Sequence, residues 1–396
     1  MNAGSALRRL AAPLCLALVI LAASAGMSRA QNVKSGWFKH SDDVLNAWTV
    51  AEVPGDHMQV SIRPRFNTAP TRRVLVLYPR PSSAYDVAIS KILQVFAEKE
   101  IDATFTVINF NNDDARGKVA LEMAEREGYG LVFSMGSEST AWLYTNYKGG
   151  MLPVVSICSK DPVELGQTKD YESGSGTNFA FTSLNMPIEV QMAYIRELRP
   201  NLRNFAILVD GKNVSAMQTQ ALPMARFARQ LGIQVLEVVV NDPDNARTEL
   251  KNLVPAAVRT MKKNDPGLTD SAFWVTGSTA VFKEIAAINA FSDRVPVISA
   301  VPEIVKPGDD SAVISIGISF ESNAHLAAVY GFEVLTGRSA AGELKVGIVS
   351  PPDIAINFRK AREIGMKVPF SFFESASYIY DYEGRAVRSA GTVPGS

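Results

Sequence analysis

The sequence predicts an α/β protein built from two doubly wound parallel-sheet lobes. The chain has 396 residues, which is more than one small domain needs and suits two compact lobes. From Arg72 onward, short apolar runs alternate with segments of helical period, and the alternation restarts after Asn185 in a second unit of similar size. Alternation of this kind is typical of parallel sheets with right-handed crossovers.

The first thirty residues have the pattern of a secretory signal peptide. Arg8 and Arg9 form a positive start, residues 10–25 form a short apolar stretch, and Ser28-Arg29-Ala30 has small residues at the positions that a signal peptidase reads. We therefore expect cleavage after Ala30 and export to the periplasm. An uncleaved membrane anchor is the alternative, but the stretch is shorter than the roughly 20 residues that a spanning helix needs. Cleavage would remove Cys15 and leave Cys158 alone, so no internal disulfide is expected.

Residues 31–70 show no clear period and contain scattered apolar residues. We expect them to form an extension packed on the outside of the first lobe.

The first α/β unit begins with a continuous apolar run over residues 74–78, as a strand buried on both faces should. The next helix begins near Ser83 and carries apolar residues at helical spacing from Ala88 to Phe96. The remaining elements expected in this unit are a strand over 104–110, a helix over 115–128, a strand over 131–133, a helix over 137–147 and a strand over 153–157.

The second unit repeats this plan, starting with an amphipathic helix marked by Ile188, Met192 and Ile195. A later helix, over 217–231, contains Pro223, where a kink is expected. The other elements expected here are strands over 205–209, 235–240, 272–275 and 296–299, helices near 245–263 and 279–291, a β-rich segment over 312–320, a helix capped by Ser322 and running to Gly337, and a strand over 354–358 with a short helix after it. Residues 376–396 read as a polar tail.

Charge and motif content argue against several function classes. Forty basic residues balance forty acidic ones with no basic block, so no nucleic-acid partner is expected. The three histidines are widely separated, so no metal is expected. No Gly-x-Gly-x-x-Gly follows the first strand, so no dinucleotide cofactor is expected. An exported α/β hydrolase would need a strand-end nucleophile with a histidine partner, and no such pair is found. Cys158 ends a buried strand without a nearby histidine and is expected to be inert. We therefore expect no enzyme activity.

Four stretches of the sequence together resemble a known family. Leu152–Val163 resembles the pattern "IPIVF…TDPV", and Asn185–Asn201 resembles "NVPIEKQLELIKELVPN". Val295–Ile298, with Gly317 downstream, resembles "IPVIA…LGFDY", and Phe332–Gly337 resembles "AVKILKG". In order and spacing these stretches are similar to the ABC-transporter substrate-binding family that includes tryptophan- and tyrosine-type binding proteins, over about residues 72–370.

This resemblance implies a type I periplasmic-binding fold, in which a three-segment hinge joins the lobes. The first lobe would hold residues 71–184 and 312–338, and the second would hold 185–311 and 339–375. The family's function would make the protein a monomeric periplasmic receptor that traps a small-molecule ligand, such as an amino acid or a similar compound, and delivers it to the membrane permease of an ABC importer. Presentation of the ligand to a membrane sensor is the alternative.

Candidate ligand-binding residues follow from the rule that parallel sheets bind ligands at the carboxyl ends of their strands. The loops at those ends supply Ser82, Ser83, Ser137, Ser139, Thr140, Asp161, Ser183, Asn185, Asp210 and Ser278. The segment from Gly136 to Thr140 opens a helix whose free N–H groups and hydroxyls can hold a carboxylate, although Ser137 can equally be a plain helix cap.

Other candidates also have structural alternatives. Asp161 can hold an ammonium or can stabilise its turn, and Ser183 and Asn185 can serve the hinge. The second-lobe loops depart from the family pattern, because Thr276–Thr279 replaces "PTDNT" and Asp210–Ser215 replaces "NPSEANS". An acid that would grip an amino group is thereby missing or moved.

Overall fold

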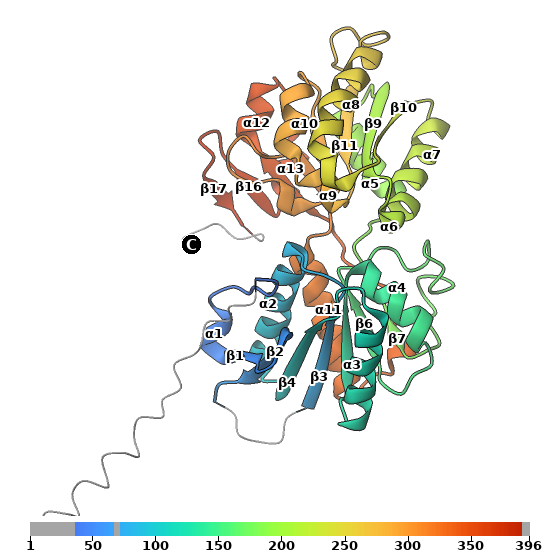
Figure 1. Ribbon diagram of the computed structural model, residues 1–396. Helices are drawn as coiled ribbons and strands as arrows, with labels where there is room; N and C mark the ends of the chain where they lie inside the picture. The colour runs from blue at the N-terminus through green and yellow to red at the C-terminus, as the bar shows by residue number, and fades with distance from the viewer. Residues whose placement is uncertain (1–35, 67–71, 390–396) are drawn as a thin grey trace, which may run out of the picture.

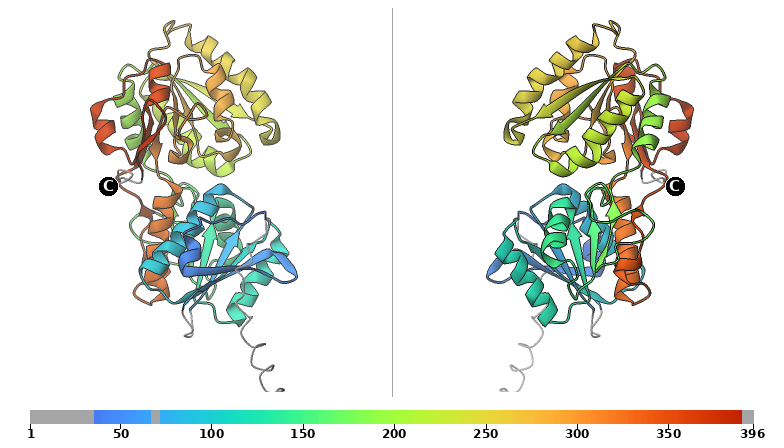
Figure 2. Two further views of the ribbon diagram at one scale, coloured as in Figure 1. Left: turned by 90° about the vertical axis from the view of Figure 1, so that its left-hand side faces the viewer. Right: turned by 90° about the vertical axis from the view of Figure 1, so that its right-hand side faces the viewer.

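The computed structural model describes residues 36–66 and 72–389, so the predicted signal peptide at 1–30 lies outside the described residues. The molecule consists of two α/β lobes, one above the other, joined by narrow connections along one side (Figure 1, Figure 2). Each lobe has its own sheet with helices on both faces, as the alternation of strands and helices predicts. Within the described part of the chain, no helix is long and apolar enough to cross a membrane.

The sheet of the first lobe has seven strands, of which the five from β4 to β7 run parallel. Strands β1 and β2 add an antiparallel hairpin at its edge. In spatial order the strands are β1 (Trp48–Val53), β2 (Asp56–Pro64), β4 (Ala103–Asn109), β3 (Arg72–Tyr78), β5 (Leu131–Met135), β6 (Val154–Ile157) and β7 (Phe179–Ala180).

The sheet of the second lobe has eight strands, with a parallel set from β10 to β13. Strand β15 pairs antiparallel with β13, and β16 and β17 extend the sheet beyond it. In spatial order the strands are β10 (Gln234–Val240), β9 (Asn204–Asp210), β11 (Ser271–Val275), β12 (Val297–Ser299), β13 (Ile314–Gly317), β15 (Asp353–Asn357), β16 (Tyr378–Tyr380) and β17 (Ala386–Arg388).

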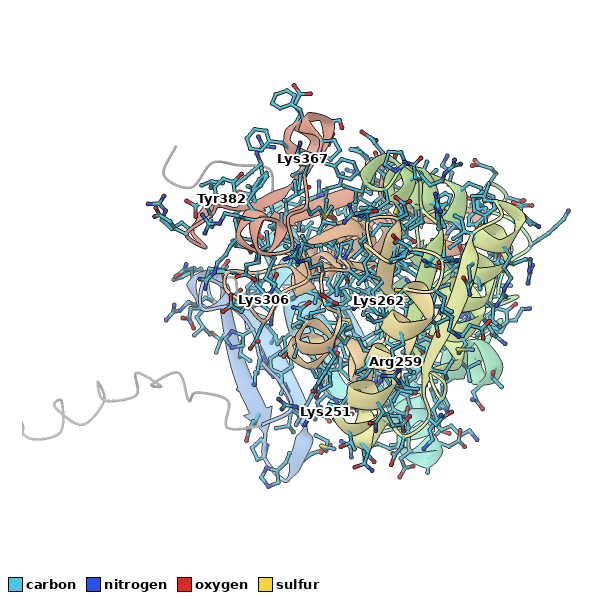
Figure 3. All side chains as sticks on the ribbon, turned by 90° about the horizontal axis from the view of Figure 1, so that it is seen from above. Lys251, Arg259, Lys262, Lys306, Lys367 and Tyr382 are labelled. Carbon is cyan, nitrogen blue, oxygen red and sulfur yellow. The ribbon has the colours of Figure 1, made fainter. Side chains whose placement is uncertain are left out.

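Helices cover both faces of each sheet. Those of the first lobe are α1 (Val44–Ala47), α2 (Ser83–Glu98), α3 (Asp114–Arg126), α4 (Gly136–Tyr147) and α11 (Phe320–Leu335), with the 3₁₀ turn η4 (Ala341–Glu343). Those of the second are α5 (Ile188–Leu198), α6 (Val214–Ala216), the π-helix η1 (Met217–Ala221), α7 (Leu222–Gln230), the 3₁₀ turn η2 (Pro243–Asn245), α8 (Ala246–Met261), α9 (Thr279–Phe282), α10 (Ile285–Phe291), the 3₁₀ turn η3 (Pro302–Ile304), α12 (Phe358–Glu363) and α13 (Phe370–Ser375). Seen from above, Lys251 and Arg259 mark α8, and Tyr382 marks the β16–β17 edge well away from it (Figure 3).

The apolar run of β3 explains how the first lobe packs. Val74 and Val76 belong to the core beneath α2 and α11, whereas Leu75 and Leu77 belong to the core on the opposite face, with Leu121 of α3. All four strand residues are fully buried. A strand with apolar residues on both faces must lie inside a sheet that is covered on both sides, which is the arrangement observed.

The segment before β3 is a built-in part of the first lobe and not a loose covering. Trp48 of β1 is buried, and its indole N–H donates to the carbonyl oxygen of Leu93 at 3.0 Å. Its ring also packs edge-on against Phe105 of β4, with 5.5 Å between centroids. The β1–β2 hairpin therefore covers the sheet edge that β4 would otherwise expose.

Three connections join the lobes. The first runs from β8 (Thr182–Ser183) to α5, the second from β13 to α11, and the third from β14 (Gly347–Ile348) to β15. Strands β8 and β14 pair in parallel as a small two-stranded sheet at the junction.

The second and third connections lie at different places from those expected. Residues 312–338 were expected in the first lobe, but their strand β13 pairs with β12 in the second sheet and only α11 lies in the first lobe. Residues 339–348 join the first lobe, where the N–H groups of Val346 and Gly347 donate to the carbonyl oxygens of Tyr171 and Phe181. Residues 376–389, expected in a tail, supply β16 and β17 of the second sheet.

One local expectation needs correction, and a second gains detail. Helix α11 begins at Phe320 with Ser319 as its N-cap, and the Ser319 hydroxyl oxygen accepts the N–H of Ser322 at 3.0 Å. Ser322, expected to be the cap, is therefore its partner. The expected helix over 217–231 contains the π-helix η1 immediately before Pro223, which is the second residue of α7. A π-turn changes the local winding, so an irregular turn precedes the proline at which a kink was expected.

Candidate functional site

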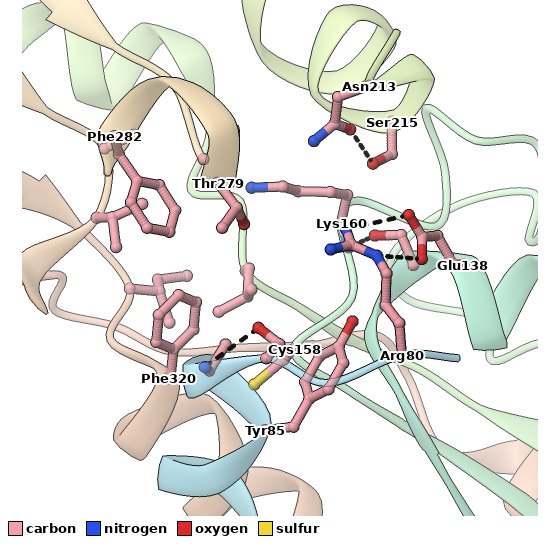
Figure 4. Close-up of a pocket in the computed structure, with 18 residues that line it drawn as sticks. Arg80, Tyr85, Glu138, Cys158, Lys160, Asn213, Ser215, Thr279, Phe282 and Phe320 are labelled. Carbon is pink, nitrogen blue, oxygen red and sulfur yellow. Dashed lines mark hydrogen bonds and ion pairs between the residues drawn. The ribbon is translucent and has the colours of Figure 1, made fainter. Parts of the chain in front are cut away.

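A pocket lies between the two lobes, at the carboxyl ends of the strands of both sheets (Figure 4). The first lobe contributes Arg80, Ser82, Ala84, Tyr85, Ser137, Glu138, Cys158, Lys160 and Leu184. The second lobe contributes Asn213, Ser215, Gly277, Thr279, Phe282, Ala300 and Val301, and the connection into α11 contributes Ile318 and Phe320. A molecule held there would contact both lobes and one hinge segment at the same time.

Arg80 and Glu138 form an ion pair at one side of the pocket (Figure 4). The Arg80 Nε and Nη2 groups donate to the two carboxylate oxygens of Glu138 at 2.8 and 3.1 Å. The hydrogen bonding of Arg80 to Glu138 is the main reason that the pKa of Arg80 is raised above its ordinary value. This two-pronged geometry satisfies both charges, so neither is free to hold a ligand without breaking the pair.

Lys160 extends from the loop after β6 across the pocket toward the second lobe (Figure 4). Its side chain is buried, and its Nζ donates to the side-chain oxygen of Gln220 at 3.3 Å. Burial lowers the pKa of Lys160 to about 8. The ammonium therefore remains mostly protonated at neutral pH while being surrounded by protein.

Gly277 of the second lobe makes room for this lysine. A side chain at Gly277 would overlap the Lys160 ammonium, and the Gly277 N–H donates to the same Gln220 oxygen at 2.8 Å. Gln220 thus holds the backbone of one loop and the cation of the other lobe. The loop over 276–279 therefore accommodates the cation of Lys160.

The opposite side of the pocket is apolar and aromatic. Phe282 of α9 and Phe320 of α11 lie on this side, and Tyr85 of α2 lies toward the floor (Figure 4). Burial raises the pKa of the Tyr85 hydroxyl, which keeps it neutral. Burial likewise raises the pKa of the Cys158 thiol, so the cysteine stays an unreactive thiol, as expected from its buried strand end. The rings of Phe282, Phe320 and Tyr85 present flat apolar surface to a ligand.

Helix α4 points its N-terminus at the pocket. Its N-cap is Met135, which makes no side-chain capping hydrogen bond. Ser137 does not cap the helix; its hydroxyl oxygen accepts the backbone N–H of Lys160 at 2.9 Å. The capping role considered for Ser137 is therefore wrong, and Ser137 instead fixes the loop that carries Lys160.

Of the ten residues predicted to bind ligand, Ser82 and Ser137 line this pocket. Ser139 and Thr140 are fully buried on the inner face of α4, where both hydroxyls contact the hydroxyl of Ser134 at 3.0 Å. Ser83 follows the Ser82 cap and lines a separate surface hollow beside α2.

Asp161 stabilises its own turn. One carboxylate oxygen accepts the N–H groups of Val163 and Glu164 at 2.9 and 3.1 Å, and the other accepts the hydroxyl of Tyr171 at 2.7 Å. The lining of the pocket does not include it. This is the structural alternative considered for an Asp-Pro turn.

The last four predicted residues build the loops behind the pocket. The Ser183 hydroxyl oxygen accepts the N–H of Asn185 at 3.0 Å, and the Asn185 amide donates to the Thr219 carbonyl oxygen at 2.8 Å. Asp210 accepts the N–H of Lys212 at 2.9 Å, and its own N–H donates to the Ser278 hydroxyl oxygen at 3.3 Å. None of these four lines the pocket.

Two polar side chains, the buried Asn323 and the half-buried Glu303, hold the junction between the lobes. Asn323 of α11 accepts the N–H of Cys158 at 2.7 Å and donates to the carbonyl oxygen of Ser183 at 3.1 Å. Glu303 of η3 accepts the N–H of Phe320 at 2.6 Å, and burial raises its pKa to about 8. The first turn of α11 is thus hydrogen-bonded to both lobes.

Sequence reasoning missed Arg80, Glu138 and, above all, Lys160. Lys160 stands where the pattern "TDPV" has Thr, immediately after a buried strand, and this departure was the available signal. Its partners Gln220 and Gly277 are 60 and 117 positions away in a second lobe, so their convergence could not be read from spacing. Across residues 36–66 and 72–389, no group of His, Cys, Asp and Glu side chains is arranged to hold a metal ion.

Comparisons with known proteins agree with this architecture. A family profile described as "ABC transporter substrate binding protein" matches residues 76–378. A search of curated proteins found no match. Among solved structures, an ABC domain from Streptococcus pneumonia in complex with L-Trp is 18% identical, with a TM-score of 0.63, and the match covers 78% of this chain and 100% of that one.

Two further structures are similar to the same extent. A conserved domain protein from Vibrio cholerae has 18% identity and a TM-score of 0.62, covering 78% of this chain and 100% of its own. A ligand-free, open substrate-binding protein with adhesive properties from Clostridium difficile has 18% identity and a TM-score of 0.58, covering 77% and 98%. At this identity the likeness concerns the fold, which is of the type I periplasmic-binding kind.

Proposed function

Because the chain belongs to the ABC transporter substrate-binding protein family, we propose that it is the periplasmic receptor of an ABC-type importer. In this proposal it traps a small polar solute between its lobes and delivers it to a membrane permease without chemical change. The observation that carries the proposal is the pocket at the strand ends that both lobes and the segment entering α11 line together.

The proposed mechanism is differential binding to two lobe arrangements. A ligand that contacts both lobes stabilises the arrangement in which they are close, and the hinge segments absorb the change. The permease then distinguishes the loaded from the empty receptor by the relative position of the lobes. Amino acids and compounds of similar size are the first ligands to screen, because the Streptococcus structure holds L-Trp.

The proposal is tested by a thermal-shift screen of amino acids, carboxylates, nucleosides and sugars. A ligand at 100 times its dissociation constant adds about 2.7 kcal/mol to the free energy of unfolding, which raises the melting temperature by several degrees. Ser215→Trp, which fills the pocket from α6, should abolish this shift. Val214→Trp is the matched control. Val214 is adjacent to Ser215, is 61% exposed and does not line the pocket.

The same pair of variants tests transport. In cells that lack the native gene, uptake of the ligand found in the screen should be restored by the parent and by Val214→Trp, and not by Ser215→Trp. If no compound of any class shifts the melting temperature, the proposal is contradicted.

A further inference from the structure

Lys160 holds an uncompensated positive charge inside the pocket between the lobes. The side chain is 7% exposed, and its Nζ makes one hydrogen bond, to the neutral Gln220 at 3.3 Å. An ammonium group has three N–H donors. Among the described residues, no carboxylate forms an ion pair with it. A buried charge without a counter-ion is costly, and the protein retains this one where a ligand would reach it.

The other charged groups that line the pocket do not cancel this charge. They are Arg80 and Glu138, which neutralise each other in their two-pronged pair. The lining therefore has two cations and one carboxylate, which leaves one positive charge in excess. The N-terminus of α4, twelve residues long and without a side-chain cap, adds further positive potential on the same side.

The surroundings hold Lys160 in this position. Ser137 fixes its backbone N–H, Gly277 leaves the space that its ammonium occupies, and Gln220 orients the ammonium from the second lobe. These contacts come from loops of both sheets. An incidental lysine would extend into solvent, because its long side chain allows the charge to stay hydrated.

The rest of the pocket suits an apolar group. Phe282 and Phe320 provide aromatic surface opposite the Arg80–Glu138 pair, and Tyr85 adds a ring at the floor (Figure 4). The lining offers no free carboxylate for an ammonium, because Glu138 is already bound to Arg80. A zwitterionic amino acid would therefore leave its ammonium without a counter-charge.

We infer that the pocket takes an organic monocarboxylate with an apolar or aromatic body and no free ammonium, and that its carboxylate binds the Lys160 ammonium. This inference rests on the proposed function and names its ligand class. One excess positive charge matches a monoanion, and a phosphate dianion would exceed it. The ligand would also take up the N–H donors that Gln220 leaves free.

The test uses four probes that share a phenyl body and differ in charge: 3-phenylpropionate, 3-phenylpropanamide, L-phenylalanine and 2-phenylethylamine. Isothermal titration of the full chain should show that the carboxylate binds at least tenfold more tightly than each of the others. Lys160→Gln should remove this preference. Lys169→Gln is the matched control, because Lys169 is exposed on the same lobe and does not line the pocket.

A second variant keeps the charge and moves it. Gly277→Ala adds one methyl group where the Lys160 ammonium lies, and the flexible end of the lysine must shift. We expect the affinity for 3-phenylpropionate to fall several-fold, with little change for the amide. Circular dichroism should show the parent spectrum for both variants, so that lost binding is not lost folding.

The outcomes separate the inference from the proposed function. Equal affinity for the carboxylate and the amide, or full carboxylate binding by Lys160→Gln, overturns the inference. So does a failure of all four probes to bind at millimolar concentration. If a compound of another charge class then binds and Ser215→Trp abolishes that binding, the receptor function stands and only the ligand class is wrong. If no compound in the wider screen binds, both fail.

Discussion

The buried ammonium of Lys160 should make the ligand-free protein less stable than it would be with an apolar residue there. Its pKa of about 8 lies below the value of about 10.4 for an unfolded lysine, and burial is the cause. Each unit of difference corresponds to about 1.4 kcal/mol, so Lys160→Met should raise the free energy of unfolding by up to about 3 kcal/mol at pH 7. Urea unfolding of both proteins measures the difference.

The sign of this effect can be checked by its pH dependence. Between pH 8 and about 10.4, the unfolded chain holds more protons on this lysine than the folded protein does. The stability of the parent therefore rises through this window relative to Lys160→Met, and the advantage of the variant should shrink toward zero. A gap that is constant from pH 7 to pH 10 would mean that the charge of Lys160 is not its origin.

The affinity for a carboxylate ligand should depend on the same titration of the Lys160 ammonium. The affinity for 3-phenylpropionate should be constant below pH 8, because Lys160 is then protonated in the free protein. Above that pH, each unit should lower the affinity by up to about tenfold, since a proton must be taken up before the ion pair forms. Titration calorimetry at pH 7, 8 and 9 measures this slope, and Lys160→Gln should show none.

Residue roles at the strand ends were only partly predictable. The rule that ligands meet the carboxyl ends of parallel strands led to the correct loops, since Ser82 and Ser137 line the pocket. It could not say which side chain of a loop turns inward. Asp161 and Lys160 are adjacent, yet Asp161 folds back on its own turn while Lys160 enters the pocket. That choice depends on Tyr171 and Gln220, which only the folded chain brings near.

At the scale of elements, the turn η3 and the start of α11 form a junction that should respond to pH. Glu303 is half-buried there, and desolvation of its carboxylate raises its pKa to about 8, while one of its oxygens accepts the N–H of Phe320. In the unfolded chain the pKa is about 4.3. The folded protein therefore holds more protons than the unfolded chain between these values, and the stability from Glu303 is lost as pH rises toward 8.

Glu303→Gln should remove this loss, because the amide is neutral at every pH and its oxygen can still accept the N–H of Phe320. The variant should match the parent near pH 4.5 and should exceed it by about 2–4 kcal/mol at pH 8.5. Denaturant unfolding at the two pH values tests this. Glu333→Gln is a suitable control, since Glu333 lies farther along α11, is partly exposed and pairs with Arg338 at 3.5 Å.

The sequence predicted the elements whose residues form the apolar core, but it did not predict where the chain crosses between the lobes. Strands such as β3 and β9 are buried along most of their length and appear in the sequence as unbroken apolar runs. Strand β13 has only four residues and directly precedes α11, so sequence alone grouped them. The structure separates them because β13 finds its hydrogen-bond partners in β12 and β15, while α11 packs on the first lobe.

At the scale of the whole molecule, the separation of the two sheets matters for function. Each sheet is covered by its own helices, and narrow connections join the lobes (Figure 2). The pocket lies between the lobes. The lobe interiors are close-packed and do not deform easily, so motion is concentrated in the connections. The binding free energy of a ligand that contacts both lobes can therefore bring the lobes together as rigid bodies.

This rigid-body motion can be measured by fluorescence energy transfer between dyes on the two lobes. Met151 of the first lobe and Val214 of the second are 76% and 61% exposed, and both can be replaced by cysteine in a chain that carries Cys15→Ser. Native Cys158 should not label, because it is buried and its pKa is raised.

We expect the transfer efficiency between the Met151 and Val214 dyes to change with ligand concentration. The dissociation constant fitted to this change should equal the one found by calorimetry. Dyes at Met151 and Val119, both exposed on the first lobe, should show no change. Saturable binding without any change in the Met151–Val214 pair would mean that the ligand occupies the pocket without moving the lobes.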